Sequence, residues 1–163
     1  MRLKIIVLLL LSGLLSATEH FTFTEWPQQI KLNKERLESE GHNAFVDIYV
    51  NKIAEKAYKT RAKLFPVGSI SYKPLFYNAT KKEPSMIVVM KKMQKGYDPK
   101  HNDWWYGVYD VPGQKAYYKG RIKSCIKCHA QVAETDYLFS QTVMDKIEHG
   151  KELMLVLPKE IKE

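Results

Sequence analysis

The sequence predicts an α+β fold: a single domain rich in antiparallel β-sheet, with a few helices and a chemical site near its C-terminal end. Runs rich in β-branched and aromatic residues recur between residues 45 and 119, and several of them alternate apolar with polar side chains, as strands do. Turn-forming residues mark a hairpin among them. The chain has 163 residues and no internal repeat, which suits one domain with one core.

Five segments have this strand character: residues 45–50, 68–77, 86–90, 104–109 and 115–119. The stretch 86–90 is almost wholly apolar, which is typical of a strand buried on both faces. Pro112-Gly113 lies between the last two segments and indicates the turn of a hairpin. These strands make up most of the predicted domain.

Two helices are expected before the middle of the chain. The first covers residues 32–40 and is ended by Gly41. The second covers residues 52–63 and places Ile53 and Ala57 on one face.

The N-terminus has the pattern of a secretory signal peptide, which we assign to residues 1–17. Arg2 and Lys4 precede an apolar run over residues 5–15, and Ser16-Ala17 supplies the small residues of a cleavage site. The run is too short to span a bilayer comfortably, although an uncleaved anchor stays an alternative. We therefore expect export to the periplasm.

Cys125-Ile126-Lys127-Cys128-His129 uses both cysteines of the chain and is the pattern of c-type haem attachment. Two thiols one helical turn apart can each add to a haem vinyl group, and His129 then lies under the iron as its proximal ligand. A zinc or dithiol site is the alternative, but the chain has no other cysteine and its remaining histidines stand singly. The motif predicts one covalently bound haem c per chain, held by Cys125, Cys128 and His129.

The formal net charge of +8 could indicate nucleic-acid binding. The lysines are dispersed, however, and the chain carries an export signal, so we expect no nucleic acid as partner. Four cations lie close to the haem motif in sequence: Lys119, Arg121, Lys123 and Lys127. They could form a docking face for an acidic redox partner or pair with haem propionates, or they could be a solvated rim, which is the interpretation we favour.

Four segments together resemble the cytochrome P-460 family and its relatives, the beta-type cytochromes c-prime: residues 48–58, 65–68, 103–109 and 125–139. The resemblance runs from about His42 to Met144. On this basis we divide the chain into an N-terminal extension over residues 18–41, a haem domain over residues 42–146 and a tail over residues 147–163.

The resemblance implies a β-rich homodimer with one five-coordinate c-type haem per subunit, His129 proximal and the opposite side open. Members of the P-460 type carry a bond from a lysine to the porphyrin edge and oxidise hydroxylamine. Lys73 falls at that lysine's position, and strand alternation would put it on one face with Ser69 and Ser71. The alternative is a solvated lysine on a half-exposed strand.

One departure from the family bears on activity. The hydroxylamine-oxidising members place a carboxylate and an arginine above the iron, where a base can accept protons. Those positions fall near Val46 and near residues 87–89, which are apolar, with Asp47 as a possible substitute. An apolar pocket suits nitric oxide. We therefore expect either oxidation of hydroxylamine or a related small nitrogen oxide, with electrons passing to a soluble cytochrome, or nitric-oxide binding without turnover.

Three further residues bear on the coordination of the iron. Asp136 lies seven residues after His129 and could accept its imidazole N–H, a role that a backbone carbonyl fills at least as often. Met144 or Met154 could supply a sixth ligand, which would make the protein a His/Met electron carrier. Methionine is also a common filler of core gaps.

Overall fold

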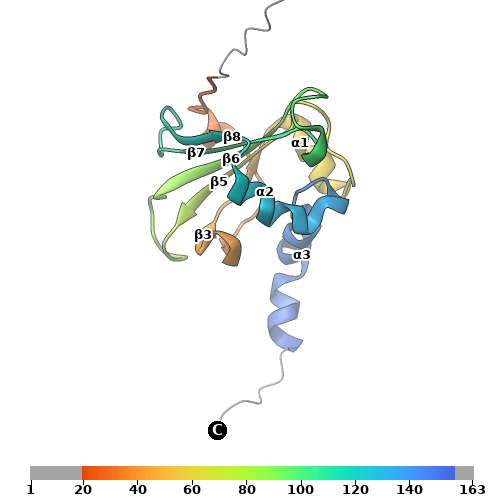
Figure 1. Cartoon of the computed structure of the whole chain (residues 1–163). Helices are drawn as coiled ribbons and strands as arrows, with labels where there is room; N and C mark the ends of the chain where they lie inside the picture. The colour runs from red at the N-terminus through yellow and green to blue at the C-terminus, as the bar shows by residue number, and fades with distance from the viewer. Residues whose placement is uncertain (1–19, 157–163) are drawn as a thin grey trace, which may run out of the picture.

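Eight strands form one antiparallel sheet in the computed structural model, which describes residues 20–156 (Figure 1). The strands are β1 (Ile30–Lys31), β2 (Leu37–Ser39), β3 (Ala44–Val46), β4 (Tyr49–Val50), β5 (Ile70–Phe76), β6 (Met86–Lys92), β7 (Trp104–Tyr109) and β8 (Ala116–Gly120). The main path runs β1-β4-β5-β6-β7-β8, while β3 also pairs with β5, and β2 with β3. The predicted α+β class with an antiparallel sheet is confirmed. The expected leader over residues 1–17 lies outside the described residues.

Three α-helices are described, and all three pack against the same side of the sheet: α1 (Lys52–Lys59), α2 (Lys123–His129) and α3 (Ser140–Val156). Short 3-10 turns join the elements: η1 (Trp26–Gln28), η2 (Glu40–His42), η3 (Pro99–His101) and η4 (Ala130–Thr135). Asn51 caps α1, because its side-chain oxygen accepts hydrogen bonds from the backbone N–H groups of Ala54 (3.0 Å) and Ile70 (3.1 Å). Within residues 20–156 no helix is long and apolar enough to cross a membrane.

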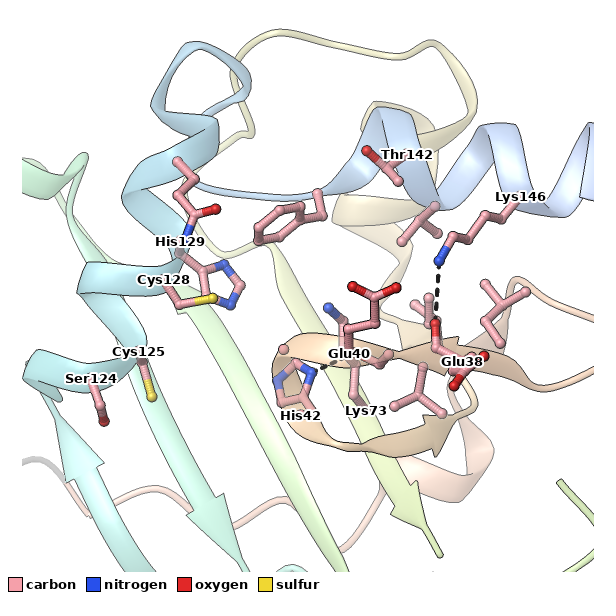
Figure 2. Close-up of a pocket in the computed structure, with 18 residues that line it drawn as sticks. Glu38, Glu40, His42, Lys73, Ser124, Cys125, Cys128, His129, Thr142 and Lys146 are labelled. Atoms are coloured by element: carbon pink, nitrogen blue, oxygen red, sulfur yellow. Dashed lines mark hydrogen bonds between the residues drawn. The ribbon is translucent and has the colours of Figure 1, made fainter. Parts of the chain in front are cut away.

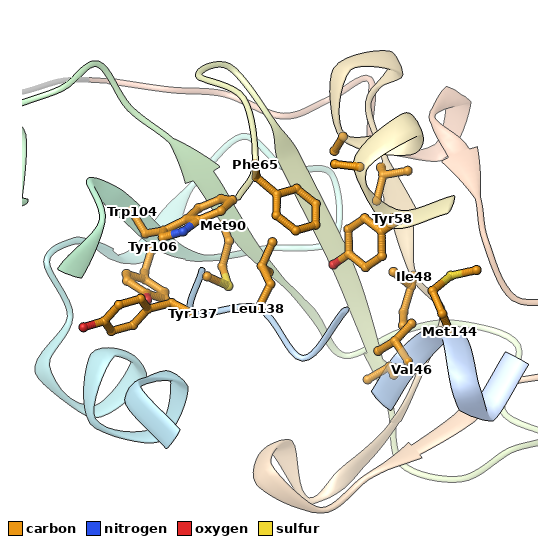
Figure 3. Close-up of a cluster of buried hydrophobic side chains, with 14 of the residues drawn as sticks. Val46, Ile48, Tyr58, Phe65, Met90, Trp104, Tyr106, Tyr137, Leu138 and Met144 are labelled. Carbon is orange, nitrogen blue, oxygen red and sulfur yellow. The ribbon is translucent and has the colours of Figure 1, made fainter. Parts of the chain in front are cut away.

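Strand alternation gives the sheet two different faces. In β7, Trp104 and Tyr106 enter the core beneath the helices (Figure 3), whereas Trp105 and Tyr109 belong to a second cluster on the opposite face. The side chains of β6 alternate in the same way between the two clusters. Both faces of this strand are therefore covered, as the apolar run predicted. The helix-covered face is the one that carries the site.

The N-terminal segment covers the second face. Phe23 and Trp26 are buried there among aromatic rings, and Phe23 packs edge-on against Tyr109 at 5.1 Å between ring centroids. The segment is held by backbone groups as well, since Phe23 N–H donates to Gly113 O at 2.7 Å in the turn between β7 and β8. Part of the expected N-terminal extension, residues 18–41, therefore belongs to the fold.

The predicted helix over residues 32–40 is wrong. This segment contains β2 and the start of η2, and it follows β1. The cause is a set of non-local bonds: buried Asn33 accepts a hydrogen bond from Ile48 N–H (2.8 Å) and donates to Val46 O (3.3 Å). These bonds tie the segment to another part of the chain and override its helix propensity.

Two other elements differ in their bounds. The expected strand over residues 45–50 is divided into β3 and β4, which pair with different parts of β5. The expected helix over residues 52–63 ends at Lys59, because Arg61 adopts a left-handed backbone (φ 52°) that a helix cannot continue through. Arg61 there reaches α3 and pairs with Asp145 at 2.7 Å.

We expect Gly107→Ala to lower the free energy of unfolding by about 1–3 kcal/mol, since it overpacks the second face. A methyl group at this position of β7 would lie 2.6 Å from ring atoms of both Trp105 and Tyr109. Denaturant unfolding measures the loss. Gly41→Ala is the matched control, because its added methyl group meets only Cys128 Sγ, at 3.6 Å. Equal stability of the two variants would contradict this account of the packing.

Candidate haem site

Helix α2 brings the whole C-x-x-C-H motif to one wall of a cavity. Cys125 and Cys128 are free thiols and half-buried, and His129 at the end of the helix is only 6% exposed. The three residues lie within two turns of helix, so both thiols and the imidazole face the same space (Figure 2). The structure therefore brings together the three residues that the motif predicted as haem ligands.

The cavity has a volume of about 510 Å³, within the range of small-molecule and cofactor sites. One wall is formed by α2, η4 and the first turns of α3, and the other by the hairpin of β2, η2 and β3 together with Lys73 of β5 (Figure 2). The apolar lining includes Leu37, Val46, Ile48, Phe139 and Val143. None of Lys119, Arg121, Lys123 and Lys127 lines the cavity, whereas Lys73 and Lys146 do.

The imidazole of His129 is held in place before any ligand binds. Its Nδ1 lies 2.6 Å from Tyr137 O, and its ring packs between Tyr106 and Phe139 at centroid distances of 5.6 and 5.4 Å. Nδ1–H donates to that carbonyl, which leaves Nε2 as the atom for a metal. Burial, with a smaller effect from Lys73, lowers the pKa of His129 to about 4. The imidazole is thus neutral near pH 7, the form that binds a metal.

Asp136 does not accept the His129 N–H, contrary to one of the two alternatives drawn from the sequence. Its fully buried carboxylate accepts hydrogen bonds from Lys92 Nζ (2.6 Å), Phe65 N–H (2.8 Å) and Trp104 Nε1–H (3.2 Å). The backbone of Asp136 is left-handed (φ 59°), and so is that of the next residue. Asp136 therefore acts on His129 indirectly, by fixing the loop whose Tyr137 carbonyl orients the ring.

Lys73 lies in the cavity, only 8% exposed, on the face of β5 that also carries Ser71. Among the described residues no hydrogen bond or ion pair reaches its ammonium group. Burial lowers the pKa of Lys73 to about 8. The solvated lysine that the sequence left as an alternative does not match this position.

Asp47 is not placed in the cavity. Its neighbours Val46 and Ile48 line the cavity, so strand alternation turns Asp47 to the other side, where it pairs with Lys31 at 2.9 Å and Arg36 at 3.5 Å. The cavity wall at Val46 is thus apolar, whereas none of residues 87–89, the other positions expected near the iron, lines the cavity.

Sequence reasoning missed most polar residues of the cavity, among them Glu38, Glu40 and His42 of the hairpin. The two carboxylates are exposed at the mouth, while His42 is half-buried. With a helix wrongly predicted over residues 32–40, nothing indicated that a turn in this region would lie against the haem motif. Gly41-His42-Asn43 is itself a turn signal, and Asn43 does adopt the left-handed backbone (φ 47°) that such turns use.

The donor set fits a covalently bound haem. Two free thiols stand beside a neutral imidazole with an open Nε2, in a cavity of suitable size. A zinc site finds no support, since no group of three or more His, Cys, Asp or Glu side chains converges in the part of the chain that the structure describes. Met144 is buried in the core and does not line the cavity, and the side chain of Met154 lies outside the described residues.

The fold and this site together define a β-rich c-type cytochrome with its C-x-x-C-H motif after the sheet. Comparison with known families agrees: the chain belongs to the cytochrome P460 family, whose model matches residues 24–140. Family membership implies a c-type haem, and Cys125 and Cys128 are consistent with its attachment through the C-x-x-C-H motif. No curated protein matches the chain in a sequence search.

We expect Asp136→Asn to lower the free energy of unfolding by about 3–5 kcal/mol, because it leaves the buried Lys92 ammonium without its counter-charge. Urea unfolding of the haem-loaded protein measures this loss. The double variant Asp136→Asn with Lys92→Met removes both charges and should recover more than half of it. A double variant as unstable as Asp136→Asn alone would show that the ion pair is not the cause.

Proposed function

We propose that this protein is a periplasmic mono-haem cytochrome of the P-460 type, with an open distal side, that oxidises hydroxylamine or acts on a related small nitrogen oxide. The observation that carries the proposal is Lys73, a buried lysine without a polar partner among the described residues, in the same cavity as Cys125, Cys128 and His129. The leader expected over residues 1–17 supports export.

A buried ammonium without a counter-charge destabilises the folded protein, so the burial of Lys73 needs an explanation. A covalent bond from Nζ to the porphyrin edge would explain it, because the nitrogen would then carry no charge. Such a bond would replace one N–H and one ring-edge C–H and so release two protons and two electrons. Hydrogen peroxide, as the oxidant, would take them up and give two molecules of water. Burial lowers the pKa of Lys73 and so increases the fraction of the neutral amine, which is the form that reacts in this step.

The chain's own residues have three tasks in this proposal. His129 binds the iron, and the Tyr137 carbonyl keeps its ring oriented and raises its donor strength. Val46 and Ile48 keep water from the ligand side. The haem, once bound, supplies the redox chemistry by accepting electrons from the nitrogen substrate and passing them on.

Nitric-oxide binding without turnover is the second candidate. The apolar wall at Val46 and Ile48 favours it, since a neutral diatomic ligand needs no proton partner there. The His/Met electron carrier has less support, because Met144 packs in the core between the sheet and α3 (Figure 3).

For partners we propose a soluble redox protein, such as another cytochrome c, and a second copy of this chain. The cations near the motif, among them Lys123 and Lys127, would suit an acidic redox partner. Strand β8 supports a dimer: within the described residues it pairs only with β7, and it carries Tyr117 and Tyr118, exposed by 52% and 68%.

The dithionite-reduced absorption spectrum tests the lysine bond. We expect a strongly red-shifted ferrous Soret band in the wild type and its loss in Lys73→Arg, because the guanidinium cannot form the same bond. Lys146→Arg, at the mouth of the same cavity, is the matched control and should keep the shifted band. An ordinary c-type spectrum in the wild type would refute the bond and leave nitric-oxide binding as the better account.

The lysine bond should also form faster at higher pH. Because burial lowers the pKa of Lys73 to about 8, the fraction of neutral amine increases as the pH rises through 8 and levels off above it. The measurement is the rate at which the shifted Soret band grows after peroxide is added to haem-loaded protein purified without the bond. A rate that is flat between pH 6 and about 9 would contradict the role of the free amine.

A further inference from the structure

We propose that His42 lies on the ligand-binding side of this site, across the cavity from His129, and would donate a hydrogen bond to the small ligand that binds there. This inference rests on the proposed open haem site. It assigns to that site a polar group that neither the motif nor the apolar strand positions supply.

The position of His42 follows from the turn that carries it. Turn η2 joins β2 to β3, and its backbone lies against the haem-bearing helix: a methyl group on Gly41 would be 3.6 Å from Cys128 Sγ. His42 is the next residue and lines the cavity. In Figure 2 the ring of His129 extends from α2 into the cavity, and the ring of His42 lies across the cavity from it, on the opposite wall.

The ring of His42 is anchored through one nitrogen. Its Nδ1 lies 2.8 Å from Ser39 Oγ, and among the described residues no hydrogen bond reaches Nε2. When the Ser39 hydroxyl donates to Nδ1, Nε2 carries the proton and becomes a donor toward the cavity. The hairpin that carries Ser39 and His42 is held in register, with Leu37 opposite Val46 and Ser39 opposite Ala44. This pairing fixes the position of the backbone from which the ring extends.

The charge state of His42 suits the role. Burial, followed by Lys73 and His129, lowers the pKa of His42 to about 3. The ring is therefore neutral near pH 7 and can donate or accept a hydrogen bond. A positive ring beside Lys73 would instead add a second unpaired cation to the cavity.

The remaining lining of the ligand side explains why one histidine matters. Val46 and Ile48 offer no hydrogen bond, and the polar residues Glu38, Glu40, Gln131 and Thr142 are exposed. Lys73 is buried, but the proposed function assigns its nitrogen to the haem edge. A hydroxylamine molecule or a diatomic ligand bound to the iron is stabilised by a hydrogen-bond donor beside it. Nε2–H of His42 can donate to either ligand.

The test is the C–O stretching frequency of the ferrous carbon monoxide complex of the haem-loaded protein, measured by infrared spectroscopy. A hydrogen bond from Nε2–H to the bound ligand weakens the C–O bond. We therefore expect a shift to higher frequency in His42→Leu, which cannot donate, and a smaller shift in His42→Gln, which can. Glu40→Gln, from the same turn, and His101→Leu, from outside the cavity, should keep the wild-type frequency.

The outcomes separate this inference from the function on which it rests. A wild type that binds no carbon monoxide overturns the open site and the inference together. A complex that forms with the same frequency in wild type and His42→Leu overturns only the role of His42. A wild type with six-coordinate ferrous haem that becomes five-coordinate in His42→Leu also overturns it, since His42 would then be an iron ligand.

Discussion

The buried carboxylate of Asp136 is the contact on which both the sheet and the site depend. It gathers donors from three separate places, namely the loop after α1, strand β6 and strand β7, and its charge is balanced by Lys92. A charge at this depth is tolerated only while that partner and those donors stay in place. The residue that follows it offers the carbonyl that orients His129, so the packing of the sheet sets the direction of the metal-binding nitrogen.

The two-residue period of strands explains why one sheet can serve two purposes. At β3 and its continuation, the apolar side chains of Val46 and Ile48 line the cavity, while the buried carboxylate of Asp47 between them pairs with Lys31 on the other side. In β7 the same alternation sends Trp104 toward the site and Trp105 toward the N-terminal segment. A slip of one residue would exchange the side chains of the two faces, and at β3 and its continuation it would turn the carboxylate of Asp47 into the cavity wall.

The features that could be predicted from the sequence are those that depend on residues close together in the chain. The alternation of the long strands β5 to β8 is local, and the structure confirms these strands as an antiparallel sheet. The spacing of Cys125, Cys128 and His129 is local as well, and family membership is consistent with its interpretation as a haem motif. The error over residues 32–40 has the opposite origin: Asn33 takes its bonds from the chain near Ile48, which no local pattern reveals. The partners of Asp136 and the approach of η2 to Cys128 are hidden for the same reason.

The two walls of the cavity come from opposite ends of the domain. The hairpin of β2, η2 and β3 precedes most of the sheet, whereas α2 and α3 follow it. Closing one wall onto the other is thus a long-range event: Gly41 and Cys128 lie 87 residues apart in the sequence, yet a methyl group on Gly41 would be 3.6 Å from Cys128 Sγ. Contacts of such sequence separation carry a large loop-closure entropy cost. A prosthetic group fixed to the two thiols would therefore be enclosed only when both ends of the domain are in place.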